Sequence, residues 1–260
     1  MTSHHPRNVV SALLIAIVGS FFSAVAMAQG VLKVYGPGGP LPAMQEAATA
    51  FETAHKIKVD TVGGPTPKWI DQAKTDADLI FSGSETMMTD FVWAMEDRIV
   101  EQSITPLYLR PAAILVRRGN PVKLRGFTDL LKPGIKVLVV NGAGQNGLWE
   151  DIAGRKGDIN TVRALRKNIV HYARNSADAK QVWADKKDID AWLIWNIWQV
   201  ANPDLAEVVP IEPEYRIYRD TGIALTQRGA SNPAAKQYVQ FLQSKEGAKI
   251  FSKWGWSTEK

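Results

Sequence analysis

The chain has 260 residues, a formal net charge of +5 and no cysteine. Without cysteine it has no disulfide framework, thiolate metal site, iron–sulfur cluster, cysteine nucleophile or lipoprotein anchor. Its lysines and arginines are interspersed with acidic residues and form no basic block, which argues against a nucleic-acid partner and only weakly favours anionic ligands. A hydrophobic content of 45% is typical of an ordinary globular core.

Residues 1–28 have the pattern of a cleaved export signal. Arg7 is the only charged residue of this segment, an apolar run extends from Ala12 to Ala26, and Ala26-Met27-Ala28 matches an AxA cleavage site. The run is shorter than the roughly 20 residues of a membrane-spanning helix, so a retained anchor is disfavoured. We therefore predict a signal peptide over 1–28 and a periplasmic mature protein that begins at Gln29.

The first block of the mature chain repeats a strand, a polar loop and a helix three times. The predicted strands are Val31–Tyr35, Ile57–Val62 and Leu79–Phe81, and the loops that follow them are GPGGP, GGPTP and SGSE. Because the carboxyl ends of parallel strands meet at one edge of a sheet, we expect these three loops to lie together where a ligand binds.

A long apolar strand follows, from Tyr108 to Arg117, which only Arg110 and Pro111 interrupt. Such a strand is suited to carry the chain from one lobe to another. A second block continues with predicted strands Ile135–Val140, Ile169–Ala173 and Asp190–Trp195, a returning strand Arg216–Leu225 and a helical tail from Pro233. The pattern predicts an α/β fold of two lobes, each a mostly parallel sheet flanked by helices, with 29–111 and 218–260 in the first lobe and 112–217 in the second.

Residues Gly142 to Gly147 spell GxGxxG between a predicted strand and a predicted helix. One interpretation is a dinucleotide fold, but that fold needs an acidic residue at the end of the next strand, where this chain has Arg174 and Asn175. A second is a tight turn without a ligand. A third, which we favour, is a pocket whose backbone N–H groups hold a small oxyanion.

Longer stretches of the sequence resemble the type II periplasmic solute-binding proteins, and more closely the accessory colonization factor AcfC group and its relatives among enteric surface antigens. The resemblance covers essentially the whole mature chain, and its most specific stretches are YGPGGP, GGPTPKW, DADLIFSGSE, TPLYLRPAAILVR, LVVNGAGQNGLWEDIAGRKGDI and DAWLIWNIWQVANPDLA. It implies a bilobal α/β fold that closes over a small anion with a phosphate, sulfate or carboxylate group. Some members of the group are described as adhesins.

Thirteen residues of these loops and strand ends are predicted to contact the ligand: Gly38, Gly39, Thr66, Lys68, Ser84, Arg110, Asn141, Gly142, Ala143, Gly144, Gln145, Asn146 and Asn196. Thr66 and Ser84 can equally be plain helix caps, and a lysine such as Lys68 is more often solvated. Arg110 either forms a structural ion pair or faces the ligand, since burying it unpaired is costly. Glu85 would repel an anion unless it accepts a hydrogen bond from a ligand hydroxyl or positions a base, so we expect it behind the contacting residues.

These features together predict a solute-binding protein that captures a small oxyanion-bearing metabolite, for ABC-type transport or for sensing. The expected partner is that anionic ligand; whether an ABC permease or a second copy of the chain in a homodimer joins it is left open by the sequence. The chain has no HExxH, GxSxG, P-loop or EF-hand motif, so we expect no catalytic residue, metal or cofactor. An adhesin that kept the binding-protein fold is the alternative, and an enzyme acting on a phosphorylated metabolite is a third choice.

Overall fold

A computed structural model of the protein describes residues 1–2 and 30–258. The predicted signal peptide therefore lies almost entirely outside the described residues. The strands are β1 (Leu32–Gly36), β2 (Val59–Gly63), β3 (Leu79–Phe81), β4 (Thr105–Val116), β5 (Val137–Val140), β6 (Ile169–Ala173), β7 (Ala191–Trp195), β8 (Glu207–Pro210) and β9 (Tyr218–Leu225). The α-helices are α1 (Leu41–His55), α2 (Ile70–Asp76), α3 (Glu85–Ala94), α4 (Leu148–Gly154), α5 (Ile159–Asn168), α6 (Ser176–Asp185), α7 (Ile197–Val200), α8 (Gln227–Ala230), α9 (Pro233–Leu242) and α10 (Lys245–Lys253).

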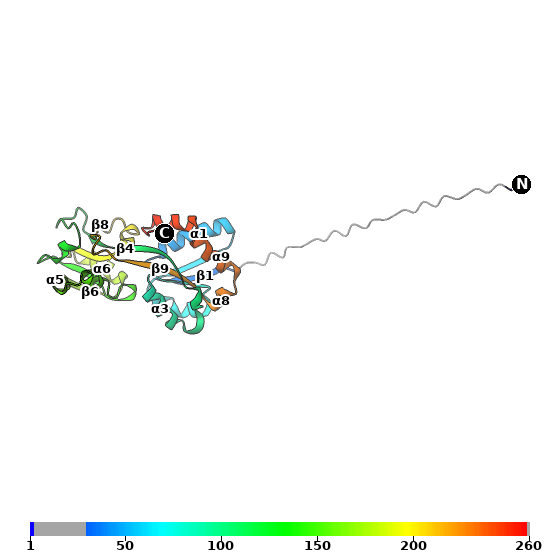
Figure 1. Cartoon of the computed structure of the whole chain (residues 1–260), viewed down its shortest axis with the longest axis horizontal. Coiled ribbons are helices and arrows are strands. Elements are labelled where there is room, and N and C mark those ends of the chain that lie inside the picture. The colour runs from blue at the N-terminus through cyan, green and yellow to red at the C-terminus, as the bar shows by residue number, and fades with distance from the viewer. Residues whose placement is uncertain (3–29, 259–260) are drawn as a thin grey trace.

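Two lobes are joined by the long strands β4 and β9 (Figure 1). The strand order is β2-β1-β3-β9-β4-β7-β5-β6, and β8 pairs with β4. The pairs of β1 with β2 and β3 and of β5 with β6 and β7 are parallel, whereas β4 and β9 are antiparallel to each other. We call β1–β3 with α1–α3 and α8–α10 the first lobe, and β5–β8 with α4–α7 the second lobe. The exact residue boundaries given above for the lobes stay a prediction.

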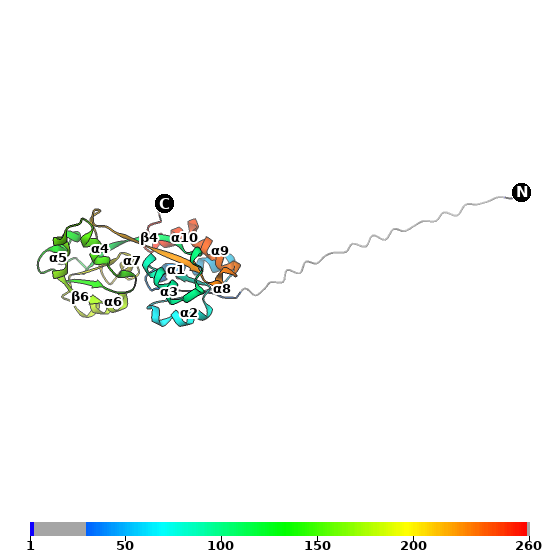
Figure 2. The ribbon, with the colours of Figure 1, turned by 60° about the horizontal axis from the view of Figure 1, so that its bottom comes forward.

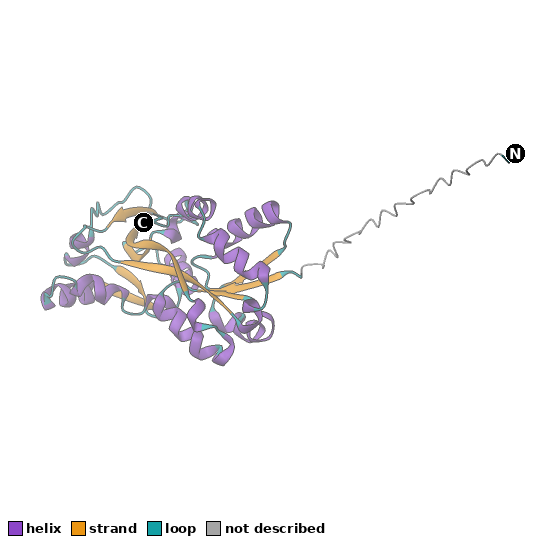
Figure 3. Ribbon diagram, turned by 45° about the vertical axis from the view of Figure 1, so that its right-hand side comes forward, coloured by secondary structure: helices purple, strands orange, loops and turns teal. Residues whose placement is uncertain are grey.

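Helices cover both faces of the first-lobe strands (Figure 3), because successive apolar residues of a strand point to opposite faces of the sheet. Leu79 and Phe81 of β3 belong to the apolar cluster that includes α1 and α9, while Ile80 between them belongs to the cluster that includes α3. Tyr238 of α9 packs against Phe51 of α1 with ring centroids 5.0 Å apart, so the C-terminal helices complete the first lobe.

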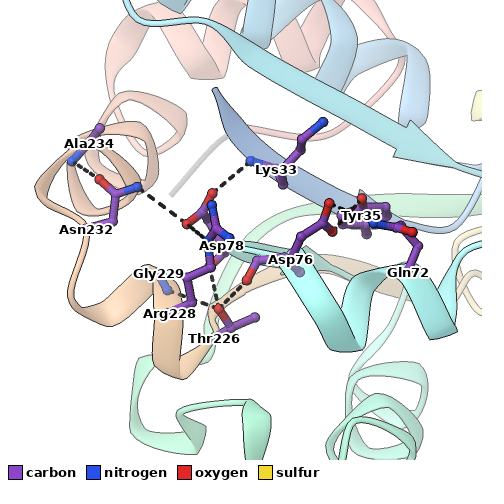
Figure 4. A network of polar contacts seen from close by, with 11 residues as sticks. Lys33, Tyr35, Gln72, Asp76, Asp78, Thr226, Arg228, Gly229, Asn232 and Ala234 are labelled. Carbon is purple, nitrogen blue, oxygen red and sulfur yellow. Dashed lines mark hydrogen bonds and ion pairs between the residues drawn. The ribbon is translucent and has the colours of Figure 1, made fainter. Parts of the chain in front are cut away.

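A buried carboxylate fastens the returning chain to the first lobe (Figure 4). Asp78, fully buried just before β3, accepts hydrogen bonds from the Lys33 backbone N–H at 2.9 Å, from Arg228 Nε at 3.1 Å and from Asn232 Nδ2 at 3.4 Å. The Thr226 hydroxyl donates to the neighbouring Ala77 carbonyl at 2.6 Å. This network lies at the amino end of β3, opposite the loops that the sequence predicts at the ligand site.

Two local differences from the sequence predictions stand out. The short strand β8 was not predicted; it pairs with the outer side of β4, three of its four residues are exposed, and it has no alternating apolar pattern to reveal it. The helical tail predicted from Pro233 is two helices, α9 and α10, and α10 begins anew where Ser244 accepts a hydrogen bond from the Gly247 N–H. Within residues 30–258, none of the helices has the length and apolar character that a bilayer crossing requires.

Candidate ligand-binding site between the lobes

A cavity of about 280 Å³ lies between the lobes, where strands of both lobes end. The first lobe contributes the loops 37–40 and 64–66 together with Gly83 and Met87, and the second contributes Gly144, Gln145 and residues 175–177. Arg110 of the crossing strand β4, Trp195 and Trp198 complete the lining. The cavity therefore occupies the position at which ligands bind in open α/β sheets, outside the carboxyl ends of the strands.

Helices from both lobes begin at this cavity. In the first lobe, α1 follows Pro40 and a short 3-10 helix starts at Thr66; in the second, α6 is capped by Asn175, whose side chain accepts from the Asp178 N–H at 2.9 Å. The first backbone N–H groups of a helix have no partner within the helix and carry a partial positive charge. An anion between the lobes would thus be faced by backbone donors from two sides.

Arg110 is the one charged side chain among the described residues that line the cavity. It is 3% exposed, and its guanidinium donates to the carbonyls of Gly83 at 2.5 Å and Asp220 at 2.8 Å. Burial lowers the pKa of Arg110 to about 9, which leaves it charged at neutral pH. Because its hydrogen bonds go to neutral carbonyls, no hydrogen-bonded carboxylate neutralises this charge.

Three polar atoms of the lining are buried and have no hydrogen-bond partner among the described residues. They are Arg110 Nε, Gln145 Oε1 and Trp195 Nε1. Buried polar groups are nearly always satisfied in folded proteins, so unsatisfied atoms at one cavity point to a bound molecule that completes them. On its other side Gln145 is fixed, since its Nε2 donates to the Ser176 hydroxyl at 2.6 Å.

Six of the thirteen predicted contact residues line the cavity: Gly38, Gly39, Thr66, Arg110, Gly144 and Gln145. Ser84 lies beside it as a buried helix cap that accepts from the Met87 N–H at 3.1 Å. Lys68, Asn141 and Asn146 are exposed and outside the lining. Ala143 lies in the short 3-10 helix that contains Gly144.

Two further predicted contacts have structural surroundings of their own. A Cβ on Gly142 would lie 2.0 Å from the Arg174 carbonyl oxygen, so this glycine permits close packing against the end of β6. Asn196 lies outside the lining, and its Nδ2 donates to the Gly255 carbonyl at 2.7 Å. Neither residue reaches the cavity, because each is held against another part of the chain.

Glu85, expected behind the contacting residues, lies at the first turn of α3 outside the lining. Its backbone N–H donates to Asp220 Oδ1 at 3.1 Å. Burial, and then the charge of the Asp220 carboxylate, raise the pKa of Glu85 above its ordinary value. The two acids form a pair beside the cavity without facing into it. Within the described part of the chain, no three histidine, aspartate or glutamate side chains cluster as metal ligands would.

Several lining residues were not predicted as contacts, chiefly Asn175, Ser176, Trp195 and Trp198. Asn175 and Ser176 follow β6, so their position obeys the same rule that pointed to the other loops. Trp195 is 1% exposed, but one side of its ring faces the guanidinium of Arg110 at 4.5 Å.

Comparison with known proteins agrees with this geometry. Residues 32–257 match the model of a family described as bacterial extracellular solute-binding protein. Peb3 from Campylobacter jejuni is 33% identical, the match covering 88% of this chain and all of that one with a TM-score of 0.82, and one of its crystal structures contains L-phospholactate.

More distant relatives share the fold. The sulfate-binding protein SubI from Mycobacterium tuberculosis H37Rv is 18% identical over 87% of this chain and 86% of its own, with a TM-score of 0.70. The sulfate-binding protein of Escherichia coli K12 is 24% identical over 167 residues, which cover 56% of this chain and 50% of that protein. The chain thus matches about half the length of this curated relative. The predicted two-lobed binding-protein fold is confirmed, and the chain belongs to the bacterial extracellular solute-binding protein family.

Proposed function

We propose that this protein captures a small metabolite bearing phosphate or carboxylate groups in the cavity between its lobes. The observation that carries the proposal is the buried charge of Arg110, which no carboxylate of the described residues hydrogen-bonds, in a lining without a carboxylate. Helix starts in both lobes add backbone donors, which stabilise an anion through oriented dipoles. L-phospholactate, bound by Peb3, has the chemistry that such a lining would accept.

The size of the cavity favours a ligand larger than a bare tetrahedral oxyanion. Its volume of about 280 Å³ lies near the lower end of the roughly 300–1,000 Å³ typical of small-molecule pockets. Sulfate or inorganic phosphate would leave much of it to water, whereas a three-carbon acid with a phosphate group would reach both lobes. We therefore rank phosphorylated hydroxy acids above sulfate as the ligand class.

The wider role follows the family and the resemblance. The proposal has three further parts. They are a periplasmic location after cleavage of residues 1–28, delivery of the ligand to an ABC permease or a sensor, and assembly as a homodimer. The family is one of solute-binding proteins, and we propose binding without catalysis. The adhesin alternative stays a prediction from the resemblance to the AcfC group.

Thermal unfolding with a panel of anions tests the proposal. L-phospholactate at about 100 times its Kd should stabilise the protein by about 2.7 kcal/mol. For a chain of this length that raises the Tm by roughly 5–10 °C. Sulfate at the same concentration should shift it less, and lactate, which lacks the phosphate, serves as the control. If no phosphorylated or polycarboxylate anion moves the Tm, the proposed function is wrong.

A further inference from the structure

The segment after α10 crosses from the first lobe onto the junction between the lobes. Ser257 pairs with Leu109 of β4, with backbone N–O distances of 2.7 Å and 3.3 Å. Before it, Gly255 has a φ of +85° and lies so close to α7 that a Cβ would be 3.0 Å from Val200 Cγ2. The segment is therefore held on one side by the crossing strand and on the other by the second lobe.

In this segment Gly255 contacts Asn196 of the second lobe, and Trp256 packs against the same arginine as Trp195. The Gly255 carbonyl accepts a hydrogen bond from Asn196 Nδ2 at 2.7 Å. The guanidinium carbon of Arg110 lies over the rings of both Trp195 and Trp256, 4.5 Å from the first ring centroid and 4.8 Å from the second. Both indoles are almost fully buried. A cation over an aromatic face is attracted by the ring quadrupole, and more strongly where water is excluded.

The two indoles and two backbone carbonyls together fix the orientation of the Arg110 guanidinium. The two indoles pack against the guanidinium, and the carbonyls of Gly83 and Asp220 fix its rotation. Nε–H is buried and has no acceptor among the described residues, and the Arg110 side chain lines the cavity. Trp256 itself does not line the cavity, so its effect on a ligand runs through Arg110.

We propose that Trp256 is a positioning residue of the ligand-binding site: with Trp195 it holds the Arg110 guanidinium in the orientation that receives the anion. This inference rests on the proposed function. Trp195 is held next to Arg110 by the pairing of β7 with β4, and Trp256 by the pairing of Ser257 with Leu109, so the arrangement requires the C-terminal segment to be docked on β4. Docking of the C-terminal segment and affinity for the anion are thereby linked.

The test compares Trp256→Leu, which keeps apolar bulk, with Trp256→Phe, which also keeps an aromatic face. By isothermal titration with L-phospholactate, Trp256→Leu should bind about 5- to 30-fold more weakly, the range expected for a desolvated cation–π contact. Trp256→Phe should recover most of the affinity. The matched control is Trp254→Leu on the same segment, where the indole N–H donates to Glu46 at 2.7 Å and does not touch Arg110. It should lower the Tm and leave the affinity unchanged.

A spectrum of the ligand-free protein tests the position of Arg110 without relying on the proposed function. In a ¹H–¹⁵N spectrum, the Arg110 Nε–H signal, assigned with Arg110→Lys, should be shifted by the two rings and protected from exchange. The shift and protection should be lost in Trp256→Leu and retained in Trp256→Phe. Unchanged affinity and an unchanged Nε–H signal in Trp256→Leu would overturn the inference. If the wild type binds none of the anions, the proposed function fails, and the Nε–H signal alone then decides whether Trp256 holds Arg110.

Discussion

Gly144 of the second lobe lies directly against Met87 of the first, so closely that a Cβ on the glycine would be 2.9 Å from Met87 Cε. The Ser84 hydroxyl would be 3.3 Å away. The third residue of the GxGxxG stretch is thus a contact between the lobes as well as part of the cavity lining. Its missing side chain lets the lobes approach each other at the edge of the cavity.

Gly144→Ala and Gly144→Val should therefore weaken ligand binding in a graded way. The Met87 methyl group is a flexible chain end and can move for alanine, whereas a branched side chain would hold the lobes apart. We expect small-angle scattering to show ligand-induced compaction for the wild type and for Gly144→Ala, and none for Gly144→Val. The control is Gly154→Ala on α4, where a Cβ meets no atom within 4 Å. Full compaction of Gly144→Val would show that this contact does not limit closure.

Arg110→Lys should abolish most of the affinity for L-phospholactate. A lysine ammonium cannot keep both carbonyl contacts and the planar packing against two indoles. The displaced cation would then no longer contact the anionic group of the ligand. We expect at least about a 30-fold rise in Kd, the lower bound for loss of a buried charged contact. Arg117→Lys is the matched control: Arg117 also donates to backbone carbonyls and stacks on an indole, that of Trp183 at 3.6 Å, but lies outside the cavity. Equal loss in both variants would mean that only folding was affected.

The acid pair beside the cavity predicts a pH effect on stability. Burial and the Asp220 charge raise the pKa of Glu85 above 4.5, so the folded protein holds the Glu85 proton more tightly than the unfolded chain. The tighter binding of this proton adds to the free energy of unfolding. The contribution is fully present below pH 4.5 and is lost as the pH rises through the raised pKa. Glu85→Gln should therefore be more stable than the wild type near neutral pH, by a margin that vanishes in acid.

Glu46→Gln is the control of opposite sign. The hydrogen bond from Lys253 is the main cause that lowers the pKa of Glu46 below 4.5, so its contribution is present above pH 4.5 and is lost as the pH falls through the lowered pKa. Urea unfolding across a pH series measures both variants. A Glu85→Gln variant that is less stable than the wild type at neutral pH would contradict the assignment of the acid pair.

The Asp78 network should matter for stability and leave the ligand affinity unchanged. Asp78→Ala leaves the buried Lys33 N–H without an acceptor and removes charge-assisted hydrogen bonds from the returning chain. We expect a loss of about 3 kcal/mol in the free energy of unfolding. Asp60→Ala removes a partly exposed ion pair with Lys33 and should cost less than about 1 kcal/mol. Both variants should bind L-phospholactate normally; a change in Kd would show that the network also shapes the cavity.

The architecture was largely predictable because its signals are local. A short apolar run bounded by loop residues marked β1 and β3, glycine with proline or serine marked the loops after them, and the single arginine within an apolar strand marked the crossing at Arg110. Asn175 and Asn196 show why the site was only partly predictable. Both follow a strand of the second lobe, but only Asn175 lines the cavity. The Asn196 side chain donates instead to Gly255, a partner 59 positions away that no local pattern reveals.

A crystal structure of the protein with L-phospholactate tests the central claim most directly. We predict the ligand between the lobes, with one anionic group within hydrogen-bond distance of the Arg110 guanidinium and the molecule in contact with the loops at Thr66 and Gln145. The account would be contradicted if the ligand lay instead in the wider, open hollow of about 930 Å³ beside α4 and β9, where Arg155 and Arg216 are exposed to it, with the interlobe cavity empty.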